Sequence, residues 1–443
     1  MSLHQVRTPT RDEVLAATSR SLPRSLYLIS AVLAAIGVLV FLLGAFTGQE
    51  RVWHALLSNW LFFTTVSSAG VTFVAVQRIT TARWSRPVIR LLEGYVAFLP
   101  AAFILLLLIL IPGQSHIFPW THEAPPVPEK VLWFDPTFFV VRNLVVFGLL
   151  AALSVWYIYT CVRLDVGNTT ESAGSERRFH GLRDRMRRKF RDERREIHST
   201  HSRQGKLAVW VGLAFGFGWT LMAWDLSMGL DLHFQSALYG WWVFMGGWVV
   251  ALMSFTLLVM WWRRYLDVYD LIGENHFHDL GKLCFAFSAF WGYLTFGQYL
   301  VIWYGNLGEE THWMHHRLSG PWKPLTLAVV FLMFVLPFFG LLSRAAKVYL
   351  PTMALFAVCS IVGLWLHRYL EVYPSLHPEA TSAPLGLWEI GVALGYLGIW
   401  GLCYAAFMDA FPRMRVTLMT SPFRDEVQVP VDAETMLPLP AHE

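Results

Sequence analysis

Residues 25–46 read SLYLISAVLAAIGVLVFLLGAF and contain no charged side chain. A helix rises about 1.5 Å per residue, so about 20 residues cross the hydrocarbon core of a bilayer. Similar apolar blocks recur along the chain, and only 15% of its 443 residues are charged. Soluble domains carry about 25% charged residues, so much of this surface must face lipid. The sequence therefore predicts an all-α transmembrane protein.

Ten apolar blocks are bounded by charges or by Pro- and Gly-rich clusters, and each is predicted to form one spanning helix. They cover residues 25–46, 54–77, 90–112, 137–162, 206–226, 237–262, 279–304, 323–342, 347–370 and 386–410. The resulting divisions are an N-terminal segment (1–24), spans 1–4 (25–162), a basic loop (163–205), spans 5–10 (206–410) and a C-terminal tail (411–443). No cleavage site follows the first block convincingly, so we expect it to be retained as a span.

The Lys and Arg residues are distributed unevenly between the two sides that these spans define. With the N-terminus inside, 29 of the 35 Lys and Arg side chains lie on the inner side and six on the outer side. Cytoplasmic loops carry such an excess of positive charge. We therefore expect a multi-pass protein of a bacterial inner membrane, with both termini and the basic loop in the cytoplasm.

The basic inner loop contains a segment with helical periodicity. Phe179, Leu182, Met186, Phe190 and Ile197 recur at helical spacing, with charged residues between them. This pattern favours an amphipathic helix lying on anionic lipid headgroups. The alternative is an ordinary solvated, positively charged loop. Nucleic-acid binding has no support in a membrane protein of this kind.

The outer loops, by contrast, are rich in Trp, His and Pro. The stretch 116–138 is too apolar for a solvated loop, and the loops 227–236 and 305–322 share its character. Two interpretations are open: an aromatic belt at the membrane interface, or a surface that another subunit covers.

Ionisable groups inside the spans indicate function best, because each costs about 2.5–3.5 kcal/mol at the bilayer centre on insertion scales. Toward the cytoplasm lie Glu93, Asp279, Lys282 and Asp409. Toward the outside lie Arg142, Asp225, His367, Arg368 and Glu389, together with Gln298. The middle offers hydroxyls, including Thr65 and Ser68 of span 2. This placement predicts two polar half-paths for protons, one from each side.

Two of these residues have structural interpretations that compete with the functional one. Arg142 needs a buried partner, for which Asp225 and Glu389 lie at similar depth. It either locks helices together or snorkels outward, or else takes part in handling protons or quinol. Glu93 either pairs with Lys282 across two helical units or belongs to a proton path.

Cofactor signals are weak throughout the chain. The only histidines in spans, His54 and His367, lie at outer ends, so paired axial haem ligands are not expected. His312, His315 and His316 could hold a metal from one helix face, but their aromatic loop disfavours it. The four cysteines lie in apolar segments without a CxxC pair and are expected to be buried. We expect neither a catalytic residue nor a bound cofactor or metal.

Two stretches suggest an internal repeat. Span 3 opens with RLLEGYVAF (90–98) and span 7 with DLGKLCFAF (279–287). They are four spans apart in the same orientation, so spans 2–5 and 6–9 are predicted to form two parallel four-helix bundles, with spans 1 and 10 flanking them.

The sequence also resembles a known family. The residues that carry this are NWLFF (59–63) with ARW (82–84), HIFPW (116–120) before WFDP (133–136), WDLSMGLD (224–231), and DLGKLCFAF (279–287) continuing to QYLVIWYGNLGEET (298–311). Over roughly residues 24–412 the chain resembles the NrfD-type (polysulfide reductase membrane subunit) family. Within it, the likeness is to the second NrfD-like subunits (the ActF group) of alternative complex III, a quinol:cytochrome c oxidoreductase.

The resemblance implies the same two bundles and a place in a complex. Its partners would be a sister NrfD-like subunit, an iron–sulfur subunit and multihaem cytochrome c subunits on the outer side, with lipids around the spans. The haem c and iron–sulfur clusters would lie in those partners, and quinol would be the substrate of the complex. The sister subunit of the family carries an intramembrane His in its second span, whereas residues 65–70 here read TVSSAG.

These observations predict an integral membrane subunit of a respiratory or photosynthetic quinol:electron-acceptor oxidoreductase. Within that role the chain either anchors the outer redox subunits or conducts and couples protons. The alternative within the same complex is that this chain binds quinol itself. A secondary transporter is disfavoured, because Pro100 and Pro337 interrupt spans 3 and 8 without the charged or Gly-rich break that transporters use. Whether the chain is itself an enzyme stays open.

Overall fold

The computed structural model describes residues 9–18, 20–123, 128–168, 176–188 and 190–424. In this part of the chain, ten helical segments are long and apolar enough to cross a membrane, so the protein is a multi-pass, all-helical membrane protein. Seven of the ten are the single helices α2 (Arg24–Phe46), α3 (Arg51–Ile79), α8 (Pro136–Asn168), α10 (Glu193–Leu226), α11 (Tyr239–Leu266), α12 (Glu274–Gly305) and α17 (Leu350–Leu376). An eighth is α18 (Leu387–Ala410).

The third and eighth spans are composite, and proline explains both. The third runs through α4 (Ile89–Glu93), the 3₁₀ segment η1 (Gly94–Phe98) and α5 (Leu99–Leu110), with Pro100 in the first turn of α5. The eighth runs through α14 (Lys323–Val330), the π-helical segment η5 (Phe331–Val335) and α15 (Leu336–Gly340). Pro337 has no N–H to donate, so the preceding turn widens to a π-type pattern instead of breaking.

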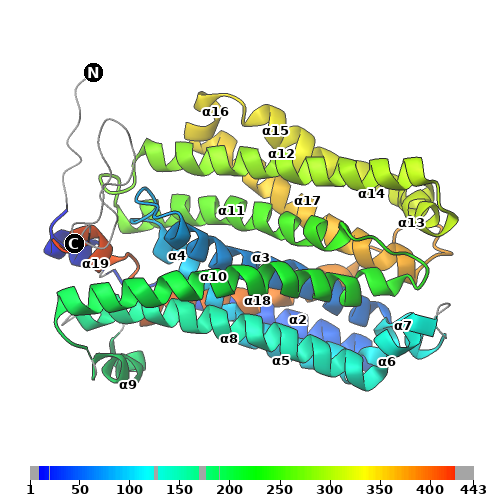
Figure 1. Ribbon diagram of the computed structural model, residues 1–443, viewed down its shortest axis with the longest axis horizontal. Coiled ribbons are helices and arrows are strands. Elements are labelled where there is room, and N and C mark those ends of the chain that lie inside the picture. The colour runs from blue at the N-terminus through cyan, green and yellow to red at the C-terminus, as the bar shows by residue number, and fades with distance from the viewer. Residues whose placement is uncertain (1–8, 19, 124–127, 169–175, 189, 425–443) are drawn as a thin grey trace, which may run out of the picture.

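Short elements cap the two ends of the bundle (Figure 1). At one end, called the terminal end here, lie α1 (Arg11–Thr18), α9 (Glu176–Arg187) and α19 (Val416–Thr420). At the opposite end lie α6 (Gln114–Ile117), α7 (Pro128–Trp133) and α13 (Gly308–Leu318). The remaining short segments are η2 (Pro119–Thr121), η3 (Met228–Leu230), η4 (Gly320–Trp322) and α16 (Arg344–Val348).

Helix α3 is the central element of the fold. All of its residues from Val52 to Ala75 are buried, and it packs on α5, α8, α10, α11, α17 and α18. A helix that is apolar on every side is expected in such a position. Helices α3, α5, α8 and α10 pack on one another, as do α11, α12, α17 and the eighth span. The grouping into two parallel bundles stays an interpretation of these contacts.

The basic inner segment is more helical than expected. Helix α10 begins at Glu193, thirteen residues before the predicted start of its span, and Ile197 lies on it. Helix α9 ends at Arg187 and α10 begins at Glu193, so the predicted amphipathic segment is divided between two helices. Met186 is buried, and Arg183 Nε donates to the Ala410 carbonyl oxygen at 2.7 Å, so α9 packs on this chain's own helices. Its contact with lipid headgroups stays a prediction.

The aromatic rings of the outer loop 116–138 are largely internal. Phe118, Trp120 and Phe134 are buried, and the rings of Trp120 and Phe134 stack with centroids 5.8 Å apart. These rings form a small core that closes the end of the bundle, so neither interpretation applies to them, and both stay predictions for the exposed residues of the loop. Leu132 is different, with 75% of its surface exposed.

Candidate functional site

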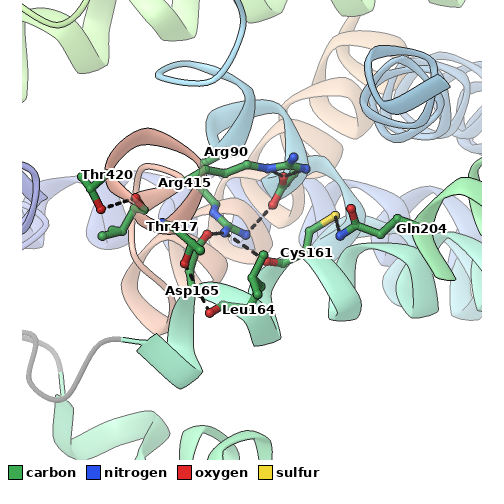
Figure 2. A network of polar contacts seen from close by, with 10 residues as sticks. Arg90, Cys161, Leu164, Asp165, Gln204, Arg415, Thr417 and Thr420 are labelled. Atoms are coloured by element: carbon green, nitrogen blue, oxygen red, sulfur yellow. Dashed lines mark hydrogen bonds and ion pairs between the residues drawn. The ribbon is translucent and has the colours of Figure 1, made fainter. Parts of the chain in front are cut away.

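Four charged side chains meet inside the terminal end of the bundle (Figure 2). Arg90 and Glu93 are fully buried and lie one turn apart on α4, where they form an ion pair. Arg90 also pairs with Asp165 of α8. Arg415, just before α19, closes the cluster, with its Nε 2.5 Å from Glu93 Oε1. Two guanidinium groups thus balance two carboxylates, which is what a low-dielectric environment requires.

This terminal cluster also holds the C-terminal segment against the bundle. The Thr417 amide donates to Asp165 Oδ1 at 2.9 Å (Figure 2). Burial acts to lower the pKa of Arg415, but the charge of Glu93 outweighs it, so the pKa lies above its ordinary value. Arg415 therefore stays protonated beside Glu93.

The other predicted cytoplasmic half-path residues do not join this cluster. Lys282 pairs with Asp279 at 2.7 Å on a solvent-accessible face of α12. The alternative that paired Glu93 with Lys282 is therefore wrong, because Glu93 is already neutralised by two arginines. Asp409 is half-buried near Arg413, whose pKa is lowered by burial and raised in part by Asp409.

At the opposite end, Arg142 and Asp225 form a two-point ion pair. Arg142 Nε and Nη2 donate to Asp225 Oδ2 and Oδ1 at 2.9 and 3.0 Å. Asn143 Nδ2 and Trp133 Nε1 each donate to the same carboxylate at 2.8 Å. The Trp133 ring also lies against the guanidinium, with Arg142 Cζ 3.9 Å from the ring centroid. Four donors saturate the carboxylate, so the helix-locking interpretation of Arg142 fits this geometry well.

Glu389, the second partner considered for Arg142, belongs to a separate cluster. Its carboxylate accepts hydrogen bonds from Arg51 Nε at 3.0 Å and Arg51 Nη2 at 2.8 Å. It also accepts one from the Tyr373 hydroxyl at 3.0 Å. This cluster ties α3, α17 and α18 together at the opposite end. Near it, His54 Nδ1 lies 3.1 Å from His377 Nε2.

A third cluster at this end contains Arg368 and His367, both predicted, and Glu371, which sequence reasoning missed. Arg368 Nη1 donates to Glu371 Oε1 at 2.5 Å and its Nη2 to the Val243 carbonyl oxygen at 2.6 Å. The other Glu371 oxygen accepts from Ser227 Oγ at 3.4 Å. Ser227 Oγ in turn lies 2.6 Å from the Tyr239 hydroxyl oxygen. The carboxylate is thus the start of a short hydroxyl chain.

Beside this third cluster lies a largely apolar cavity of about 330 Å³. Five helical segments enclose it: α11, α12, α13, α17 and the eighth span. Its walls are mainly aromatic and aliphatic, and include Trp242, Trp291, Tyr299, Trp313, Met314 and Phe334. His367, Gln298, Glu371 and Arg317 also line it. A concave apolar site with a few converging polar groups is the usual form of a small-molecule site.

Two polar side chains of this cavity are buried without a hydrogen-bond partner among the described residues. His367 and Gln298 are more than nine-tenths buried, and within the described residues neither ring nitrogen and neither amide atom has a hydrogen-bond partner. His367 Nδ1 lies 3.2 Å from Glu371 Oε1 without hydrogen-bond alignment. Buried polar groups are normally paired, and leaving one unpaired costs about 1–3 kcal/mol.

Arg317 of α13 is the one arginine that lines this cavity among the described residues. Its guanidinium donates to the Leu370 carbonyl oxygen and to Ser375 Oγ, both at 2.9 Å, and lies over Trp313 at 3.7 Å. Burial lowers the pKa of Arg317 to about 10, so it stays charged at neutral pH. A fixed positive charge therefore stands near Glu371.

The hydroxyls predicted to fill the middle of the membrane bond mainly along their own helix. Thr65 Oγ1 donates to the Leu61 carbonyl oxygen, and Ser68 Oγ donates to that of Thr64 at 2.6 Å. Ser68 additionally accepts from Trp219 Nε1 at 2.7 Å. These hydroxyls are thus hydrogen-bonded to backbone carbonyl oxygens and to Trp219 in a closely packed centre. A proton path through them stays a prediction.

Several members of these clusters escaped sequence reasoning for a common reason. Glu371 lies just beyond the predicted end of its span at 370, although its spacing of three and four residues from Arg368 and His367 was a usable signal. Arg90, Arg51 and Arg415 were counted only as loop charges. Asp165 was assigned to the basic loop, whereas α8 continues through it.

Among the residues that the structure describes, no group of three or more His, Cys, Asp or Glu side chains is arranged to hold a metal ion. A comparison of the chain with protein-family models gave no match, and a comparison with curated proteins gave none either. The functional assignment therefore depends on the residues and the geometry of the site.

Proposed function

We propose that this chain is a membrane subunit of a quinol:electron-acceptor oxidoreductase and that it binds the quinol head in the cavity beside His367. The observation that carries the proposal is the pairing of an aromatic, apolar cavity with buried, unpartnered His367 and Gln298. A quinol is a flat ring with a hydroxyl at each end. Indole rings can stack on such a ring, while an imidazole and an amide can bind its hydroxyls.

The proton chemistry of quinol oxidation suits the same residues. Each hydroxyl loses a proton as the ring loses an electron, so a base must lie within hydrogen-bond reach. His367 is one such base, and Glu371 lies 3.2 Å from it. From Glu371 the hydroxyls of Ser227 and Tyr239 lead away from the cavity. We assign these residues to the release of protons toward the opposite end.

The two electrons must pass to an acceptor in the complex. If the chain is such a subunit, as its resemblance to the NrfD-type family implies, haem c and iron–sulfur clusters would lie in partner subunits on the outer side. The opposite end carries the cavity, and the Lys and Arg distribution favours placing the terminal end in the cytoplasm of a bacterial cell. On that orientation, the cavity faces the same side as the acceptors, and Leu132 of the outer loop belongs to their docking surface.

The proposal is tested by quinone binding to the purified chain in lipid nanodiscs. Trp242, Trp291 and Trp313 line the cavity, so a bound short-chain ubiquinone or menaquinone analogue should quench tryptophan fluorescence. We expect His367→Leu and Gln298→Leu each to weaken binding about ten-fold, the loss of one hydrogen bond to a buried partner. Equal affinity in both variants would remove the quinol site from this chain.

A control separates binding from general damage. His377→Leu removes a histidine at the same end that does not line the cavity, and we expect it to leave quenching unchanged. All variants should elute as the native chain does and unfold at similar temperatures. Weaker binding in the His377 variant as well would mean that quenching reports on the fold and not on the cavity.

Proton conduction across the chain is a second proposal, and it is based on the ionisable residues buried near both ends of the bundle. It depends on the terminal cluster and the Arg142–Asp225 pair acting as ends of two half-paths. Glu93→Gln and Asp225→Asn should then lower the protons taken up per quinol oxidised by the assembled complex. An unchanged stoichiometry in both variants would leave these residues a structural role only.

A further inference from the structure

A second cavity lies at the terminal end, between α8, the start of α10 and α9, which stand side by side there (Figure 1). Its volume is about 480 Å³. It is unusual in being lined by five arginines, namely Arg163, Arg185, Arg191, Arg195 and Arg203. Among the described residues, Glu196 is the one carboxylate that lines it with them.

The charge in this cavity is not balanced within the described residues. Glu196 is occupied by Arg163, with Nη1 2.9 Å from Oε2, and it also accepts the Arg191 amide at 3.2 Å. The other four guanidinium groups form no ion pair with a carboxylate in the described part of the chain. Arg195 and Arg203 lie eight residues apart on α10, so they project from one face of it. The cavity therefore has a strong preference for an anion.

The walls continue into a surface suited to lipid. Trp156 and Tyr159 line the cavity from α8 and are 58% and 41% exposed. They precede Arg163 by seven and four residues, so they lie about 10 and 6 Å closer to the membrane interior. Trp210 and Leu213 on α10 are also exposed in that direction. Exposed Trp and Tyr below a ring of Arg mark the headgroup level of a bilayer.

We propose that this arginine cavity binds the phosphodiester of an anionic phospholipid, whose acyl chains run along α8 and α10. Guanidinium groups bind phosphate oxygens in a bidentate manner, and basic pockets at the ends of spans recognise anionic headgroups. The occupant also explains the shape of the segment. Phosphate would hold α9, the turn at Arg191 and α10 together where five arginines would otherwise repel one another. The inference does not depend on the quinol site.

The test is native mass spectrometry of the full chain, released from detergent and titrated with phosphatidylglycerol. Arg191→Gln/Arg195→Gln removes two unpaired charges from the cavity. Arg264→Gln/Arg344→Gln removes two exposed charges at the same end but outside it. We expect the cavity variant to bind phosphatidylglycerol at least about ten-fold more weakly and the control variant to match the native chain. Equal weakening in both variants would overturn the proposal, because binding would then follow surface charge alone.

Two further ligands identify the source of the phosphate. Phosphatidylcholine, with no net charge, should bind the native chain and the cavity variant equally. Inorganic phosphate should fail to displace phosphatidylglycerol, because it lacks the acyl chains that pack beside Trp156. Displacement by inorganic phosphate at similar concentration would assign the cavity to free phosphate and overturn the lipid. As a fold control, phosphatidylglycerol should raise the unfolding temperature of the native chain more than that of the cavity variant.

Discussion

At the scale of the residue, several buried charges of this bundle are neutralised by a partner of opposite sign. Three ion pairs illustrate this: Arg142 with Asp225, Arg51 with Glu389, and Arg368 with Glu371. A lone charge in such surroundings would cost several kcal/mol, whereas a hydrogen-bonded pair largely offsets that cost. The pairs therefore specify which helices meet, and removing one partner should be worse than removing both.

The Arg142–Asp225 pair makes this testable. Asp225→Ala leaves Arg142 buried without its carboxylate and should lower the free energy of unfolding by about 3 kcal/mol. The double variant Arg142→Met/Asp225→Leu should lose clearly less, because no charge is stranded. The measurement is the midpoint of SDS-induced unfolding in detergent. Glu309→Gln, an exposed carboxylate at the same end, is the control; a double variant as unstable as Asp225→Ala would contradict the argument.

At the scale of the element, α2 packs along α18 through small residues. A Cβ atom added to Gly395 would lie 2.6 Å from Gly37 Cα, closer than real atoms approach. Gly391 and Gly398 give similarly close contacts on the same face of α18. In lipid, helices associate through such close backbone approach, because apolar burial alone does not drive it.

Gly395→Ala should therefore push the two helices apart, at a cost of about 1–3 kcal/mol from overpacking. Gly212→Ala on α10 is the matched control, because a Cβ there meets nothing within 4 Å. It should be neutral or slightly stabilising, since alanine favours helix more than glycine. The same SDS titration compares them. Equal stability of the two variants would mean that α2 and α18 do not pack through their glycines.

Helix α19 is short, and an ion pair and a backbone hydrogen bond hold its N-terminal end against the bundle. Its docking depends on the ion pair between Arg415 and Glu93 and on the hydrogen bond from the Thr417 amide to the Asp165 carboxylate. An isolated helix of five residues is not stable alone. The C-terminal segment is therefore a latch over the terminal cluster.

Arg415→Ala should release this latch. Amide hydrogen exchange of residues 416–420 should become at least about ten-fold faster, because docking no longer protects them. Arg344→Ala removes an exposed charge at the same end and should leave exchange unchanged. Slow exchange in the Arg415 variant would show that packing, and not the ion pair, holds α19.

At the scale of the whole molecule, both capped ends of the bundle carry distinct chemistry. The terminal end holds the arginine cavity and the excess of positive charge. The opposite end holds the aromatic core of the outer loop and the cavity beside His367. The proposed functions of the two ends require that they face opposite sides of the membrane.

This orientation is tested by labelling single cysteines in a chain whose four native cysteines are replaced. Glu123→Cys lies at the opposite end and Ser202→Cys at the terminal end, and both positions are exposed. In intact bacterial cells, a membrane-impermeant maleimide should label position 123 and should reach position 202 only after lysis. Labelling of position 202 in intact cells would reverse the orientation and separate the quinol cavity from the outer acceptors.

Much of this architecture is determined by the sequence alone, because a spanning helix satisfies its own backbone hydrogen bonds. Length and hydropathy are local properties, so most span ends could be placed within a few residues, although α8, α10 and α17 extend further than predicted. The distribution of Lys and Arg is equally local and carries the predicted orientation. Even the pairing of Arg142 with Asp225 was among the expected options, because their depths along the membrane matched.

Only the tertiary structure decided the remaining partners. Glu389 pairs with Arg51, 338 residues away, and Glu93 pairs with Arg415, 322 residues away. Such contacts depend on how each helix is rotated and tilted against its neighbours, which hydropathy does not encode. The cavity beside His367 forms only where five helical segments come together. Trp120 becomes buried only because its loop folds back on the bundle. The sequence thus determines how deep each residue lies in the membrane, whereas tertiary packing determines which residues become neighbours.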